Sequence, residues 1–127
     1  MDWVAIVIGL ALAEYAVFVW QCGQARGRHG VPAPSTSGNP SYERYFRVQM
    51  NTVEQLVLFL PGMLLFGHYV SGPGAAATGL VFILGRGLYA RGYVQDPARR
   101  GPGFALTLLA NTILVVGGLV GAVIRLI

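Results

Sequence analysis

Four long apolar runs limit what this chain can fold into. The first covers residues 3–22 and is interrupted by one charged side chain, Glu14, and the others cover about 42–70, 75–95 and 103–126. A helix needs about 20 mostly apolar residues to cross the hydrocarbon core of a bilayer, so each run is long enough to span it. We therefore predict an all-α integral membrane protein, a bundle of four transmembrane helices in a single domain over residues 1–127.

The composition agrees with a membrane setting. The chain is 54% hydrophobic and 11% charged, whereas soluble domains carry about 25% charged residues. A secretory signal peptide begins with basic residues, but this chain begins with Met1 and Asp2. We therefore interpret the first run as a retained helix.

Helix-breaking residues separate the four runs. Residues 23–41 are dense in Gly, Pro, Ser and Asn, which predicts a loop, and Ser71–Gly74 predicts a break between the second and third helices. Gln95–Gly103 predicts a basic loop before the last helix. Pro61 lies inside the second run, where proline removes a backbone donor and favours a kink.

Basic residues gather around the first and third loops. The second loop has no Lys or Arg, and the C-terminal end has only Arg125. By the positive-inside rule, the first and third loops face the cytoplasm and both termini lie outside. The net charge of +4 is then a one-sided membrane feature, and the sequence does not indicate nucleic-acid binding, which needs a basic face with base-reading elements.

Polar side chains enter two of the apolar runs on one face each. Arg47, Asn51 and Glu54 are spaced i, i+4 and i+7, so they share one face of a helix. A polar group inside the hydrocarbon core needs a hydrogen-bond or ion-pair partner, because without one its burial costs roughly several kcal/mol. The string 43–54 leads directly into the apolar residues 55–66, which predicts a functional site there.

The third run carries a second polar face. Arg86, Tyr89 and Tyr93 are spaced i, i+3 and i+7. Arginines bind carboxylates through two parallel hydrogen bonds and a glutamate accepts an ammonium, so both faces together suit a small zwitterion with more than one carboxylate. Its candidate ligands are Arg26, Arg47, Gln49, Asn51, Glu54, Arg86, Tyr89, Tyr93 and Arg100. The alternative is a set of interhelical ion pairs and snorkelling arginines.

These strings resemble a known family. Arg47-x-Gln-x-Asn-x-x-Glu54, followed by Arg86-x-x-Tyr-x-x-x-Tyr93 and the pair Arg99-Arg100, resembles the MAPEG family, the membrane-associated proteins of eicosanoid and glutathione metabolism. The similarity is strongest to the microsomal glutathione transferase and leukotriene-C synthase branch and covers nearly the whole chain. Gln55 departs from it, because that branch often has a tyrosine after the glutamate. The short, basic chain indicates a bacterial protein.

The resemblance implies a fold, a reaction and a place in the cell. It implies a homotrimer that binds glutathione between subunits near the cytoplasmic face, in a bacterial inner membrane. Glutathione would serve as co-substrate, with no metal, and Arg100 would be the catalytic residue that stabilises its thiolate. The implied activity is that of a membrane-bound glutathione transferase, or glutathione peroxidase, acting on a lipophilic electrophile or lipid hydroperoxide. The remaining eight candidate ligands would hold the tripeptide.

Two other functions remain open. One is a non-catalytic, lipid-binding MAPEG member. The other is a small proton-coupled multidrug exporter that uses Glu14, since an intramembrane carboxylate is a functional candidate. We favour a structural role in which Glu14 pairs with Asn111. His29 and His68 are predicted on opposite sides of the membrane and cannot share a metal, and the single cysteine, Cys22, excludes an intramolecular disulfide.

Overall fold

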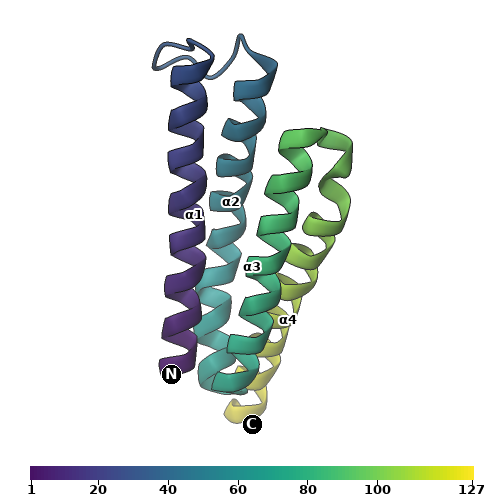
Figure 1. Ribbon diagram of the computed structural model, residues 1–127. Coiled ribbons are helices and arrows are strands. Elements are labelled where there is room, and N and C mark those ends of the chain that lie inside the picture. Colours follow the sequence, from purple (N-terminus) through teal and green to yellow (C-terminus); the bar gives the residue numbers. More distant parts are fainter.

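The computed structural model describes all residues, 1–127, as helices joined by short connections (Figure 1). Helices α1 and α2 are joined by the longest of these connections, and α3 and α4 by the 3-10 helix η1. The bounds are α1 Asp2–Arg28, α2 Pro40–Tyr69, α3 Gly72–Gln95, η1 Pro97–Arg100 and α4 Gly101–Leu126. The four long helices run alternately in opposite directions, so both termini lie at one end of the bundle (Figure 1). The other end, with the α1–α2 loop and η1, is called the basic end below.

The surface of the bundle is suited to lipid. α1, α2 and the segment Pro97–Leu126 are each long and apolar enough to cross a membrane. α3 is not among them, because it combines glycines with Arg86 and Arg91. Large apolar side chains point outwards along the helices; examples are Ile6, Leu10, Val57, Leu80, Leu84, Leu108, Leu119 and Ile124. The all-helical membrane prediction is therefore confirmed, with three helical segments that meet the length and hydropathy of a membrane span.

Local sequence explains where the middle helices begin. Asn39 accepts a hydrogen bond from the Tyr42 backbone N–H at 2.9 Å, with Pro40 in the first turn. Ser71 likewise accepts from the Gly74 N–H at 2.9 Å. Such N-caps satisfy backbone donors that have no partner inside the helix. α2 then continues as one helix through Pro61.

All three predicted loops are shorter than expected, and the one between α2 and α3 is reduced to Val70 and Ser71 because α3 begins at Gly72. α1 continues to Arg28, so residues 23–28 are helical instead of forming part of the loop. Glycine weakens a helix without ending it, the first proline comes only at Pro32, and Ala25 is fully buried in a cluster with Tyr42. The basic loop after α3 contracts to Asp96 and the turn η1, because the Asp96 carboxylate caps that turn at the Ala98 N–H.

The helices meet through aromatic rings and small residues. Phe59 of α2 stacks on Phe82 of α3 with ring centroids 3.9 Å apart, and both are fully buried. α1 packs against α2 and α3, and α4 packs against the same two helices. A Cβ added at Gly85 would lie 2.9 Å from Leu106 Cβ, so α3 and α4 approach closely there. Small residues allow such contacts between helices in lipid.

Candidate binding cavity

An open cavity of about 390 Å³ lies at the basic end of the bundle, among α2, α3 and the start of α4. It is lined by Arg47, Asn51, Tyr89, Tyr93, Arg100 and Phe104. All of these except Phe104 are candidate ligands from the sequence. Residues more than fifty positions apart thus meet at one hollow.

The α3 wall of the cavity is an aromatic and cationic stack. The Tyr89 and Tyr93 rings, one helical turn apart, are stacked with centroids separated by 5.6 Å. The guanidinium of Arg86 lies 4.3 Å from the centre of the Tyr89 ring, and its Nη2 donates to Asn51 Oδ1 at 2.8 Å. Arg86 itself is 0% exposed. It therefore supports the cavity wall from behind without lining the hollow.

At the rim, Arg47 and Glu54 form an ion pair. Arg47 Nη2 lies 3.5 Å from Glu54 Oε1, and the two side chains are 50% and 55% exposed. Exposed pairs of this kind contribute about 0–1 kcal/mol. Breaking this ion pair therefore costs little free energy, so Arg47 and Glu54 can each bind a charged group of a ligand instead.

Arg100 reaches the cavity from η1. Its Nη1 donates to the Pro97 carbonyl at 2.9 Å, and the residue is exposed. The turn that carries it is held by the Asp96 cap. With Arg47 it brings two guanidinium groups to the hollow, and no carboxylate lines it. Such a cavity repels metal cations and suits an anionic ligand.

Four candidate ligands do not line this cavity: Glu54 and Arg86, which lie at its rim and behind its wall, and Arg26 and Gln49. Arg26 donates to the Ser35 carbonyl at 2.7 Å and the Val31 carbonyl at 3.3 Å, and its Nη2 donates to the Tyr42 hydroxyl. It therefore holds the α1–α2 loop. Gln49 lies on α2 but does not line the hollow.

Further along the bundle axis, Gln55 is used for helix packing. Asn111 Nδ2 of α4 donates to the Gln55 carbonyl at 3.3 Å and to Gln55 Oε1 at 3.1 Å. The predicted pairing of Glu14 with Asn111 is therefore wrong. Asn111 faces α2, whereas Glu14 is on α1, which packs against α2 and α3.

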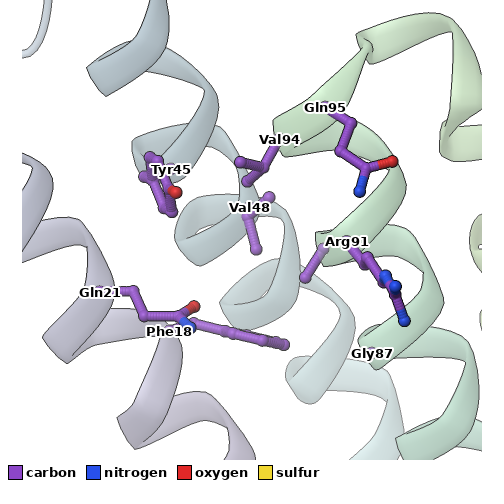
Figure 2. A pocket seen from close by; sticks show the side chains of 9 residues that line it. Phe18, Gln21, Tyr45, Val48, Gly87, Arg91, Val94 and Gln95 are labelled. Atoms are coloured by element: carbon purple, nitrogen blue, oxygen red, sulfur yellow. The ribbon is translucent and has the colours of Figure 1, made fainter.

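A second hollow, of about 320 Å³, opens among α1, α2 and α3 (Figure 2). It contains none of the candidate ligands. Phe18 extends across its floor, and Gln21, Tyr45, Val94 and Gln95 surround it in Figure 2. The side of the α2–α3 pair that faces α4 thus carries the candidate site.

Phe104 was not expected at the cavity. It lies in the first turn of α4, one turn after Arg100. The sequence contains one indication of this position: Phe104 lies four residues after Arg100, and residues i and i+4 share a face when η1 leads directly into α4.

The fold and cavity define a class: an integral membrane helix bundle with a cationic, tyrosine-walled cavity at its basic end. The model of the MAPEG family matches residues 4–120, and the chain belongs to the MAPEG family.

Its relatives include an uncharacterized protein of Synechocystis sp., 50% identical over 92% of this chain and 85% of that protein. Microsomal glutathione S-transferase 2 of Bos taurus is 38% identical over 88% of this chain and 77% of its own length. Leukotriene C4 synthase of Cavia porcellus is 36% identical over 74% of this chain and 61% of its own.

Proposed function

We propose that this protein is a membrane-bound glutathione transferase. The observation that carries the proposal is the convergence of Arg47, Asn51, Tyr89, Tyr93 and Arg100 on one cavity. Glutathione has two carboxylates, one ammonium and one thiol, so it needs cationic groups, one anionic group and a means to hold a thiolate. Similarity to microsomal glutathione S-transferase 2 supports the same substrate.

Each charged group has a natural counterpart on the tripeptide. Arg47 binds a carboxylate through its planar guanidinium, and Glu54, next to it, accepts the ammonium. Asn51, held by Arg86, and the tyrosine hydroxyls supply neutral hydrogen bonds.

Arg100 is the proposed catalytic residue. A free thiol has a pKa of about 8.5, and an adjacent guanidinium favours the thiolate by charge and hydrogen bonding. The thiolate sulfur then attacks an electrophilic carbon of a lipophilic acceptor, forming a C–S bond while the displaced electron pair goes to the leaving group or to the acceptor itself. The acceptor enters from the bilayer, and the protein supplies proximity between substrates from two phases.

The peroxidase reaction uses the same thiolate. Its sulfur attacks the terminal oxygen of a lipid hydroperoxide, the O–O bond breaks, and the alkoxide takes a proton from water and leaves as an alcohol. A second glutathione then reduces the sulfenic product, giving glutathione disulfide and water.

A homotrimer would complete the site. Arg26 and Gln49 lie outside the cavity of their own chain, so they would reach glutathione from a neighbouring copy. All four long helices would span the membrane, with the basic end on the cytoplasmic side of a bacterial inner membrane, as the distribution of arginines favours.

The test is calorimetric binding of reduced glutathione to the purified protein in detergent. We expect saturable binding that Arg47→Ala and Glu54→Gln each weaken at least tenfold. Arg125→Ala, which removes an arginine at the opposite end of the bundle, is the matched control and should bind normally. Absence of binding to the unaltered protein would refute the proposal. Binding without conjugation of 1-chloro-2,4-dinitrobenzene or reduction of cumene hydroperoxide would instead support a non-catalytic family member.

A further inference from the structure

Glu14 is a carboxylate in the middle of α1 that the proposed mechanism does not use. Its Oε1 is buried and has no hydrogen-bond partner. Its Oε2 lies against Gly87 of α3, 3.5 Å from where a Cβ on that residue would be. The side chain therefore points from α1 towards α3, next to Arg86.

Arg86 has buried nitrogen atoms without hydrogen-bond partners. Its Nη2 is bonded to Asn51, but Nε and Nη1 are buried without partners. Glu14 and Arg86 carry opposite charges and lie near each other where α1 meets α3, without a direct ion pair between them. A buried, unpaired guanidinium is costly, because the protein interior replaces its hydration poorly. The other charged and titratable groups facing this region are Tyr89 and, beyond it, Tyr93, Arg47 and Arg100 at the cavity. Glu14 is the acidic side chain among them.

We propose that Glu14 is the counter-ion of Arg86 and, through it, a positioning residue for the cavity. α1 does not line the cavity, yet Glu14 neutralises the guanidinium that holds Asn51 and supports the Tyr89 ring. The second part of this inference, an effect on glutathione, rests on the proposed function; the first part, the charge coupling between Glu14 and Arg86, does not.

The arrangement explains why a charged residue is tolerated in α1. Asn111 is already bonded to Gln55, and Glu14 faces the opposite side of the α2–α3 pair. An exporter would use Glu14 as an exchangeable proton site. A counter-ion is instead held in place opposite a permanent positive charge.

The experiment is a double-mutant cycle with two readouts. Glu14→Gln, Arg86→Gln and the double variant are compared by thermal unfolding in detergent and by glutathione calorimetry. Glu43→Gln is the matched control, since it removes an exposed carboxylate that forms no ion pair. Glu14→Asp and Arg86→Lys, which keep the charges, form a second cycle that serves if either glutamine variant fails to fold.

For the charge coupling, we expect the loss of Tm in the double variant to be clearly smaller than the sum of the two single losses, because removing both charges leaves neither uncompensated. Additive losses would overturn the coupling.

For positioning, we expect Glu14→Gln to weaken glutathione binding at least fivefold, Glu14→Asp to recover part of it, and Glu14→Gln to have no further effect on top of Arg86→Gln. Unchanged affinity in a folded Glu14→Gln protein would overturn the positioning role. If the unaltered protein bound no glutathione, the proposed function would fail, while the unfolding cycle would still decide the coupling between Glu14 and Arg86.

Discussion

Gly103 and Gly101 offer a matched test of the contact between α3 and α4 that forms the cavity. Both lie in the first turn of α4, two residues apart. A Cβ at Gly103 would overlap the Tyr89 backbone and lie 2.6 Å from the Gly85 carbonyl oxygen, whereas one at Gly101 would meet nothing within 4 Å. Alanine should therefore destabilise the protein at position 103 and be tolerated at position 101.

The magnitude follows from that overlap. Ordinary contact begins at 3.4 Å, so relief of the Gly85 contact alone requires Gly103→Ala to move α4 away from α3 by about 0.8 Å, and relief of the deeper Tyr89 overlap requires more, against backbone that cannot give way as a flexible side chain would. Overpacking of this kind costs about 1–3 kcal/mol. At roughly 4 °C per kcal/mol for a chain of this size, the Tm should fall by about 4–12 °C. Gly101→Ala removes backbone freedom from the unfolded chain and should leave Tm unchanged or raise it by up to roughly 4 °C.

Thermal unfolding of both variants in the same detergent measures these shifts, and glutathione conjugation by the same samples measures the site. Moving α4 also moves Phe104, and the η1 turn with Arg100, relative to Tyr89. Gly103→Ala should therefore lose activity even below its Tm. Equal Tm values for the two alanine variants would refute the close α3–α4 approach.

Three further predictions concern single side chains. Phe59→Ala should lower the free energy of unfolding by about 3–5 kcal/mol, because it empties a fully buried site stacked on Phe82; Val57→Ala, on the exposed face of α2, should cost far less, and similar losses would argue against the aromatic core. Ser71→Ala should cost about 1 kcal/mol in the same unfolding assay by removing the α3 N-cap, whereas a loss of that cap without effect would mean that the turn alone starts the helix. Arg100→Ala should raise the pKa of the bound thiol and lower turnover at neutral pH, with little change in glutathione affinity. Thiolate absorbance, at about 240 nm, measures this pKa. The Arg99→Ala/Arg100→Ala double variant controls for replacement of Arg100 by its neighbour, and a titration like that of the unaltered protein would remove Arg100 from the mechanism.

Much of the candidate site could be predicted from the sequence because helical spacing is a local property. Residues at i, i+4 and i+7 share a face in any straight helix, so the sequence alone places Arg47 beside Asn51 and Tyr89 beside Tyr93. The apolar runs were equally informative, since bilayer thickness sets the length of a spanning helix.

The tertiary structure decided which faces meet. Glu14 turns to α3 and Asn111 to Gln55, although either pairing would satisfy the helical pattern of its own segment. Which helix faces meet depends on how closely the helix backbones approach at glycines such as Gly85. The position of Arg100 at the cavity depends separately on the 3-10 turn that carries it. Contacts between distant segments leave no period in the sequence, so the fold alone shows that Arg86 is buried behind the cavity and that Phe104 lines it.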